Sequence, residues 1–264
     1  MMIYRFTFSL LLFIWFYALA GCGTSSEESA PHEMGNRVHA EAPDAETKTE
    51  QGYIMPGMDH GILQSPINIY SQAAENKQHK IVLNYETSKE SVSNLGHTVQ
   101  VNYQEGSSID FDGRSFAFKQ FHFHTPSEHK IDGITYPLEM HMVHVLEHDP
   151  DSTPHYLVVG ILFKEGKENP FFNEFMNEIP KEAGTTLEED KTEVNVNHLF
   201  EGIDNAYYYY MGSLTTPPYT ETVNWVILKH IFEASPTQVE KLNRIEGNNA
   251  RHIQAIYGRK VEAS

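Results

Sequence analysis

The sequence predicts a mainly β domain with a few short peripheral helices, and three observations point to it. Several segments alternate apolar and polar residues with the period of two that is typical of strands, among them 120–124 and 139–144. Asp-Gly dipeptides at 112–113 and 132–133 mark tight turns between such segments. Residues 156–164 form a continuous apolar run, which indicates a strand buried on both faces. With 264 residues, 40% of them hydrophobic, the chain is long enough to bury one large core.

The first residues are predicted to be a signal peptide, over 1–21. Arg5 supplies a positive start, and the apolar run that follows at 6–20 is too short to span a bilayer comfortably. The run ends in Leu-Ala-Gly-Cys at 19–22, which resembles the lipobox of bacterial lipoproteins, where the signal is cut before a cysteine that is then lipidated. Cys22 is the single cysteine of the chain and so has no intramolecular partner. An ordinary signal peptide with an incidental cysteine is the alternative.

Residues 22–51 are predicted to be an acidic, flexible tether, because serine, glutamate, alanine, threonine and proline replace large apolar residues there. The folded domain is then expected at 52–264. We expect an exported protein, anchored to the bacterial cell membrane through lipid on Cys22, with the domain on the extracytoplasmic side. The net charge of −17 argues against nucleic acid and against an anionic membrane surface as electrostatic partners.

Two helices are predicted within the domain. The first spans 169–179 and ends at Pro180, because its large apolar residues recur at a spacing of three to four. The second runs over 237–243, with Ser235 as its cap and Pro236 in its first turn. Neither helix carries a pattern that indicates chemistry, so both are expected to serve packing.

Histidines are placed where two predicted strands meet. His122 and His124 are two residues apart and project to the same side of one strand, while Glu139 and His141 do so on the next. The turn at 132–133 brings the two strands together, so three imidazoles can converge. Three histidines with an open fourth position are the ligand set of a catalytic zinc site, whereas structural zinc sites are usually closed and rich in cysteine. The simpler interpretation is a set of half-buried histidines.

Several motifs now carry a resemblance to a known family. They are Gln-Ser-Pro-Ile-Asn-Ile at 64–69, Gly-His-Thr-Val-Gln-Val at 96–101, the segment 122–129, the segment 139–144, Gly-Ser-Leu-Thr-Thr-Pro-Pro at 212–218, Asn-Trp at 224–225 and Asn-Ala-Arg at 249–251. In these motifs and in their order, the chain resembles the α-class carbonic anhydrases over about residues 60–260. The resemblance implies a single large, twisted, mostly antiparallel sheet with a few short helices around it.

The resemblance also implies a reaction and a metal. His122, His124 and His141 would hold a Zn2+ ion, and a zinc-bound hydroxide would hydrate carbon dioxide reversibly to bicarbonate and a proton. His97 would be the proton shuttle. Without the other motifs, His97 would be interpreted as a histidine in a surface turn.

Further residues take roles by the same resemblance. Thr215 would accept a hydrogen bond from the hydroxide and pass its own proton to Glu128, with Thr216 beside it in the substrate cleft. Gln120 would orient His122, Glu139 would orient His141, and the backbone carbonyl of Asn249 would receive the proton of His124. The apolar wall of the carbon dioxide pocket would consist of Val143, Val158, Leu214 and Trp225.

One departure and two alternatives accompany the resemblance. Many secreted relatives place a disulfide cysteine directly after the Thr-Thr-Pro-Pro loop, where this chain has Tyr219, so packing must stiffen that loop. A zinc hydrolase of another kind is one alternative, although the sequence contains no His-Glu-x-x-His or Gly-x-Ser-x-Gly motif. A non-catalytic binding module on the same fold is the other. The sequence leaves a homodimer open.

Overall fold

The computed structural model of the protein describes residues 61–149 and 153–264, without the side chains of 189–192. The predicted signal peptide at 1–21, the tether at 22–51 and the lipidated Cys22 lie outside the described residues. Within the described residues, no helix is both long enough and apolar enough to cross a membrane.

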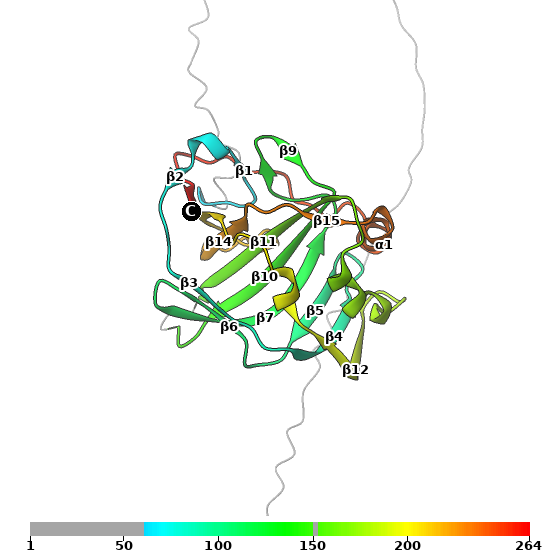
Figure 1. Ribbon diagram of the computed structural model, residues 1–264. Helices are drawn as coiled ribbons and strands as arrows, with labels where there is room; N and C mark the ends of the chain where they lie inside the picture. The colour runs from blue at the N-terminus through cyan, green and yellow to red at the C-terminus, as the bar shows by residue number, and fades with distance from the viewer. Residues whose placement is uncertain (1–60, 150–152) are drawn as a thin grey trace, which may run out of the picture. The chain divides into compact units, whose positions relative to one another are not determined.

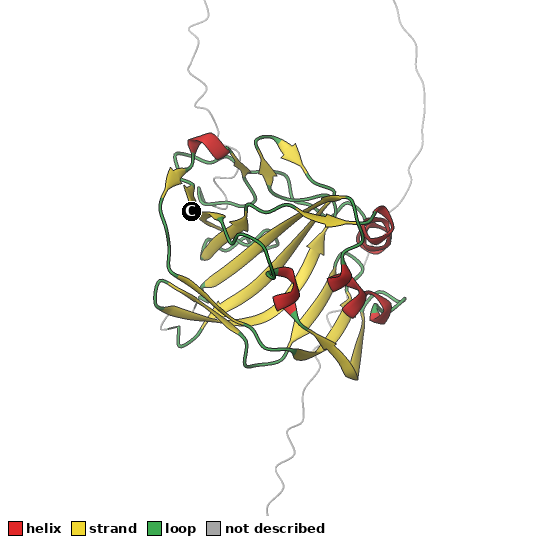
Figure 2. Cartoon of the chain, viewed as in Figure 1, coloured by secondary structure: helices red, strands yellow, loops and turns green. Residues whose placement is uncertain are grey.

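One large, twisted, mixed sheet of 13 strands dominates the described part of the chain (Figures 1 and 2). Along its main path it contains, in order, β12 (Thr185–Val194), β4 (Ser88–Asn94), β5 (Val99–Tyr103), β7 (Arg114–His124), β10 (Leu138–Leu146), β11 (Tyr156–Glu165), β14 (Val223–Leu228), β13 (Tyr207–Gly212), β16 (Glu262–Ala263) and β2 (Glu75–Asn76). Most of these pairs are antiparallel, but β11 pairs in parallel with β14 and β16 pairs in parallel with β2. The predicted fold class is confirmed.

The remaining strands lie off this path. Strand β6 (Ser108–Phe111) joins β3 (Ile81–Asn84) to β7, and β15 (Phe232–Ala234) pairs with β11. A separate small sheet consists of β1 (Asn68–Ile69), β8 (Lys130–Ile131) and β9 (Ile134–Thr135).

The second predicted helix is confirmed and the first is wrong in type. Helix α1 spans Pro236–Glu246, where the Ser235 side chain accepts from the backbone N–H of Gln238 in a capping box. Residues 169–179 form two 3₁₀ helices instead of an α-helix, η3 (Pro170–Glu174) and η4 (Met176–Glu178), which break at Phe175. Two further 3₁₀ helices are η2 (Ser71–Ala73) and η5 (Val196–Leu199).

Aromatic packing explains this difference. The rings of Phe171, Phe172 and Phe175 are all buried, and Phe175 stacks on Phe123 with ring centroids 5.6 Å apart. A spacing of three matches the 3₁₀ period, which places Phe172 and Phe175 on the same side, toward the sheet. The apolar spacing at 169–179 therefore indicated a buried face correctly but did not distinguish between the two helix types.

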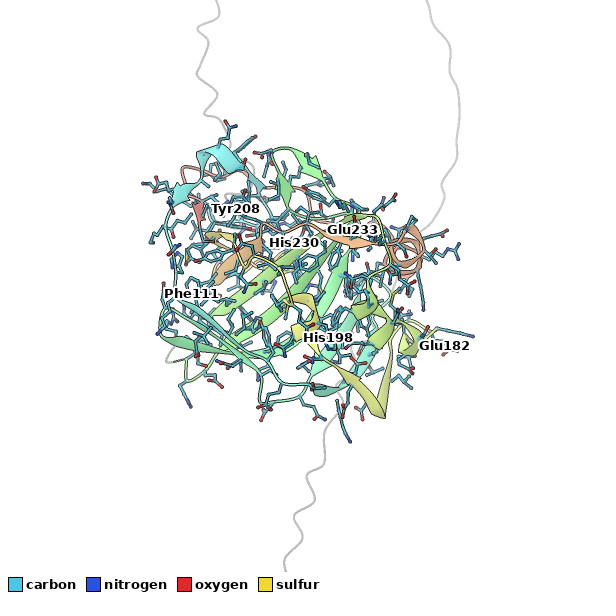
Figure 3. All side chains as sticks on the ribbon, viewed as in Figure 1. Phe111, Glu182, His198, Tyr208, His230 and Glu233 are labelled. Carbon is cyan, nitrogen blue, oxygen red and sulfur yellow. The ribbon has the colours of Figure 1, made fainter. Side chains whose placement is uncertain are left out.

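The two faces of the sheet carry different kinds of side chain. Phe121 and Phe123 of β7 project into the larger apolar core, whereas His122 and His124, which alternate with them, project to the opposite face. That opposite face carries a second apolar cluster, built around Val158 and Trp225. In Figure 3, side chains fill the space around the strands of the sheet. The alternation along β7 thus places the phenylalanine rings in the core and the histidines on the opposite face.

A bulge in the pairing of β7 with β10 maintains this separation. The register shifts between Val143 and His144, which face Gln120 and Phe118, so Lys119 is the extra residue. An odd spacing along a regular strand places two side chains on opposite faces. Because of the extra residue, Phe118 and Phe121 nevertheless lie on the same face. The sequence pattern gave no indication of this bulge.

A buried carboxyl on β4 makes the stability of the protein depend on pH. Glu90 is 6% exposed, and neither of its carboxylate oxygens has a hydrogen-bond partner among the described residues. Burial, and to a smaller extent the carboxylates of Glu174 and Glu178, raise the pKa of Glu90 to about 8. The folded state therefore holds this proton more tightly than the unfolded chain does.

We expect Glu90→Gln to flatten the pH dependence of stability between about pH 4.5 and pH 8. A raised folded-state pKa gives stability that is present below the unfolded value and is lost as pH rises through the folded value. The loss in the wild-type protein amounts to a few kcal/mol at most, since one pKa unit corresponds to about 1.4 kcal/mol. Urea unfolding across this pH range measures it, with Glu188→Gln on the exposed side of β12 as the control. Parallel curves for wild type and Glu90→Gln would contradict the assignment.

Candidate metal centre

The three predicted ligand histidines come together on neighbouring strands. Strands β7 and β10 are antiparallel, with His141 opposite His122 and Glu139 opposite His124. The Asp-Gly turn at 132–133 does not join these strands directly, because it closes the small hairpin of β8 and β9. The expected proximity is nevertheless correct, since that hairpin lies within the connection between them.

The imidazole rings converge on one point. Ring centroids are 5.1 Å apart for His122 and His124, 5.3 Å for His122 and His141, and 4.6 Å for His124 and His141. One ring nitrogen from each histidine lies within 4.8 Å of the other two. His124 and His141 are buried, and His122 is half-buried. The three residues can therefore offer nitrogen atoms to a single ion.

Hydrogen bonds select which nitrogen each ring can offer. His122 Nδ1 lies 2.9 Å from Gln120 Oε1, and His141 Nε2 lies 2.8 Å from Glu139 Oε1. Because these oxygens can only accept, each bonded nitrogen carries the proton. The lone pairs of His122 Nε2 and His141 Nδ1 therefore remain available.

The third ring has no hydrogen bond within the described part of the chain. His124 Nδ1 and Nε2 are both buried without a hydrogen-bond partner there, and so is the nearby Glu128 Oε2, which lies 3.6 Å from His124 Nε2. The backbone of Asn249 lies close enough to His124 to raise its pKa, but the geometry falls short of the expected hydrogen bond. Buried polar atoms are normally satisfied, so unpaired nitrogen and oxygen atoms at one point fit a bound cation.

The electrostatics of the rings agree with metal ligation. Burial, followed by the neighbouring imidazoles, holds the pKa of His122 and His124 well below the usual value, so both rings are neutral. Burial acts in the same direction on His141, but the carboxylates of Glu139 and Glu128 outweigh it and raise the pKa of that ring. Two neutral rings and a third held by carboxylates are a donor set suited to Zn2+.

Glu139 connects the centre to a wider buried network. Its Oε2 accepts the backbone N–H groups of Glu128 and His129, both at 2.8 Å, and its Oε1 lies 2.6 Å from His129 Nδ1. Although burial opposes it, contact with His129 and His141 holds the pKa of Glu139 well below the usual value. The carboxylate is therefore charged and fully engaged. His129, Glu139 and His141 also lie close enough to be ligands of one ion, but the hydrogen bonds between them explain that proximity.

The network continues through residues that the sequence analysis did not identify. His129 Nε2 lies 2.6 Å from the Tyr210 hydroxyl, which donates to Ser65 Oγ at 2.9 Å. Of the four consecutive tyrosines at 207–210, Tyr207, Tyr208 and Tyr210 are buried. The available signal was the third histidine of the segment 122–129, whose strand partner could not be known from spacing.

Glu128 and Thr215 lie together beside the ligand nitrogens. Burial, and to a smaller extent the carboxylate of Glu139, raise the pKa of Glu128, while His141 and the hydroxyl of Thr215 act against that shift. Glu128 Oε2 is 3.9 Å from His141 Nδ1, and its Oε1 accepts the backbone N–H of Arg251 at 2.9 Å. The two predicted residues are thus placed next to the centre, with Thr215 only 9% exposed.

The residues predicted to form an apolar wall share one cluster. Val158 and Trp225 belong to the second apolar core, and Val143 and Leu214 pack against it. The ring of Trp225 lies 4.8 Å from that of His141, and its Nε1 donates to the Ser213 carbonyl at 3.0 Å. An apolar surface therefore borders the ligand histidines.

The loop after Thr215 is held by packing, as expected from Tyr219. Thr216 is exposed at its start. The guanidinium of Arg251 lies 3.7 Å from the centroid of the Tyr219 ring, and its Nη1 donates to the Ser65 carbonyl at 2.6 Å. A cation–π contact thus stands where a disulfide was expected in relatives.

His97 is exposed at the loop that precedes β5. Its Nδ1 lies 3.1 Å from the Leu95 carbonyl, which can only accept, so Nε2 of the neutral ring has a free lone pair. His97 lies close enough to His122 to affect the pKa of that ring. The exposed His97 therefore lies in the neighbourhood of the predicted metal ligands.

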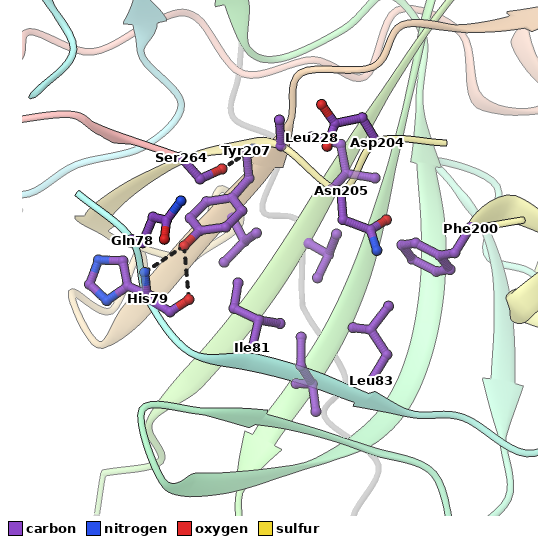
Figure 4. A pocket seen from close by; sticks show the side chains of 14 residues that line it. Gln78, His79, Ile81, Leu83, Phe200, Asp204, Asn205, Tyr207, Leu228 and Ser264 are labelled. Atoms are coloured by element: carbon purple, nitrogen blue, oxygen red, sulfur yellow. Dashed lines mark hydrogen bonds between the residues drawn. The ribbon is translucent and has the colours of Figure 1, made fainter. Parts of the chain in front are cut away.

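A cavity of about 490 Å³ lies away from these residues (Figure 4). Its lining includes Val159 and Val226, which follow Val158 and Trp225 in the chain and face the other side of the sheet. In Figure 4, the hydroxyl of Tyr207 bonds the backbone of His79 at its edge. None of the three predicted ligand histidines lines this cavity, which is therefore separate from the histidine cluster.

Comparisons with known proteins identify the family of this chain. The family model described as eukaryotic-type carbonic anhydrase matches residues 54–264. A carbonic anhydrase of Neisseria gonorrhoeae is 39% identical over 205 residues, which cover 75% of this chain and 76% of the relative. Dioscorin DB3L of Dioscorea polystachya is 32% identical over 212 residues, which cover 76% of this chain and 75% of the relative.

A solved structure is similar to this chain in both fold and sequence. It is that of the α-carbonic anhydrase from Thermovibrio ammonificans with the inhibitor sulfanilamide, at a TM-score of 0.71 and 36% identity, covering 76% of this chain and 87% of that one. Sequence and fold agree in this assignment. The chain belongs to the eukaryotic-type (alpha) carbonic anhydrase family of enzymes.

Proposed function

We propose that the protein catalyses the reversible hydration of carbon dioxide to bicarbonate and a proton, using zinc. The observation that carries this proposal is that one ring nitrogen from each of three imidazoles converges on one point, beside buried polar atoms that lack hydrogen-bond partners among the described residues. An apolar wall borders this point. Family membership supports the same activity.

His122 Nε2, His141 Nδ1 and a nitrogen of His124 would hold the zinc ion. Zinc acts as a Lewis acid and makes hydroxide available from water near neutral pH. Gln120 and Glu139 hold the rings of His122 and His141 in the tautomers that direct lone pairs to the metal.

The residues around the ion orient the reactants. The hydroxyl of Thr215 lies close enough to Glu128 to affect its pKa. If it donates to Glu128, it would be left to accept from a reacting oxygen and so orient a lone pair of that oxygen toward the substrate. The side chains of Val143, Val158, Leu214 and Trp225 offer an apolar surface to carbon dioxide, which carries no charge. Bicarbonate is charged and gains less from this surface, so release of the product is favoured.

A direct test is stopped-flow hydration of carbon dioxide by the purified protein, with and without a zinc chelator. We expect rapid hydration that the chelator abolishes and added zinc restores. Absence of hydration by a protein that holds one zinc ion would contradict the proposal and favour a zinc hydrolase or a binding module.

Proton export is assigned to His97. We expect His97→Ala to lower kcat about tenfold or more in weak buffer, because general acid–base groups typically contribute about 10²–10⁴-fold. The value of kcat/KM should change little, since it reports the hydration step and not proton export. Imidazole buffer should restore kcat. A loss of kcat/KM, or a loss that buffer does not restore, would contradict the assignment.

We also propose that the protein is exported and anchored through lipid on Cys22. The sequence at 19–22 supports this. Cys22→Ser should move the protein from the membrane fraction to the soluble fraction in a bacterial host that processes lipoproteins, as immunoblotting would show. Equal membrane association of the two proteins would contradict lipidation.

A further inference from the structure

One side chain joins the loop of His97 to the strand that carries the metal ligands. Asn249 Nδ2 donates to the backbone carbonyls of His97 at 2.8 Å and Phe123 at 3.1 Å. Asn249 Oδ1 accepts the backbone N–H of Thr125 at 3.0 Å. Phe123 and Thr125 flank His124 on either side, so the amide of Asn249 spans from the loop to the backbone of a ligand.

The loop itself is closed by local hydrogen bonds. The Leu95 N–H donates to the Thr98 carbonyl at 3.0 Å, and Gly96 adopts a φ of 80°, which favours glycine. The imidazole of His97 in turn bonds the Leu95 carbonyl. The hydroxyl of Thr98 donates to the Phe123 carbonyl at 2.8 Å. The loop is therefore a compact unit whose attachment to β7 sets the position of its histidine.

We infer that Asn249 is a positioning residue for proton transfer, because its side-chain amide fixes the backbone of His97 relative to the metal centre. The inference rests on the proposed function. Transfer of a proton between two sites depends steeply on their separation, and a small displacement of one site has a large kinetic effect. This role of the side chain is separate from the contact of the Asn249 backbone with His124, which falls short of a hydrogen bond.

Asn249→Asp keeps the hydrogen bond from the Thr125 backbone and removes the hydrogen bonds to the carbonyls of His97 and Phe123. Aspartate has the same shape and keeps an oxygen to accept from Thr125 N–H. Its second oxygen, however, replaces the donor and faces the carbonyl oxygens of His97 and Phe123. Asn243→Asp is the matched control, because Asn243 Nδ2 donates to Thr125 Oγ1, the Gly247 carbonyl and Asn248 Oδ1, and none of these hydrogen bonds, over the described ranges, reaches the loop of His97.

The kinetic test measures kcat and kcat/KM for carbon dioxide hydration in weak buffer. For Asn249→Asp we expect kcat to fall about tenfold, kcat/KM and zinc affinity to stay within about twofold, and imidazole buffer to restore kcat. In a His97→Ala background the same change should have no further effect, because Asn249 acts through His97. Asn243→Asp should behave as the wild type does.

A second readout does not depend on activity. Hydrogen exchange of the backbone at 95–99, measured with and without zinc, should accelerate about fivefold in Asn249→Asp, the equivalent of one lost hydrogen bond, and not in Asn243→Asp. The inference is overturned if exchange is unchanged, if kcat/KM and zinc affinity fall together with kcat, or if the loss persists in His97→Ala. An inactive wild-type protein would refute the proposed function and this role with it, whereas an active wild type with an unaffected variant refutes the role alone.

Discussion

His122→Ala should abolish carbon dioxide hydration and weaken zinc binding by more than about 100-fold, the upper end for loss of an outer hydrogen-bond partner of a ligand. His122 is the least buried of the three histidines, and its partner Gln120 is also half-buried, so the variant should fold. Two imidazoles would then remain at the centre, with one nitrogen donor too few for a catalytic zinc site.

Zinc titration and calorimetry check this result together. Zinc should raise the melting temperature of the wild-type protein by mass action and should raise that of His122→Ala far less, while the two zinc-free proteins should melt alike. His230→Ala, which removes an exposed histidine elsewhere, serves as the control. If His122→Ala bound zinc with wild-type affinity, the ligand set would have to be reassigned.

Glu139→Ala should have the second large effect, on both stability and metal affinity. Glu139 is fully buried and receives His141, His129 and two backbone N–H groups, so its removal leaves several buried donors without an acceptor. Loss of one member of a buried charged pair typically costs about 3–5 kcal/mol. Loss of the bond to His141 should also weaken zinc binding by about 10–100-fold.

Gln120→Ala provides the comparison, since it removes a bond of the same kind to His122 at a half-buried position. It should weaken zinc binding without a comparable loss of stability. Chemical denaturation and zinc titration of the two variants separate the effects. A folded Glu139→Ala protein with unchanged zinc affinity would show that Glu139 serves the fold alone.

Much of the site could be predicted because it depends on the spacing of residues that are close together in the sequence. The alternation of histidine and phenylalanine at 120–124 fixes which side chains share a face, and Glu139 lies two residues before His141 on the same face. Both patterns depend only on strand geometry, and both hydrogen bonds to the ligand rings are present. The cap of α1 at Ser235 is equally local and was found for the same reason.

What could not be predicted depends on contacts between distant segments. The bond of His129 to Tyr210 joins residues 81 positions apart, and that of Asn249 to His97 joins residues 152 apart. Neither pairing leaves a signal in spacing. The bulge at Lys119 and the 3₁₀ geometry of η3 are set by how aromatic rings fit into the core, which a count of apolar positions does not contain.

The contact of Arg251 with Tyr219 bears on where the domain can fold. A loop secured by a guanidinium on an aromatic ring needs no thiol oxidation, and the single cysteine of the chain lies at position 22, ahead of the domain. The domain should therefore mature equally well in a reducing cytoplasm and in an oxidising compartment, without a disulfide-forming catalyst, and should withstand strong reductants that inactivate cross-linked proteins.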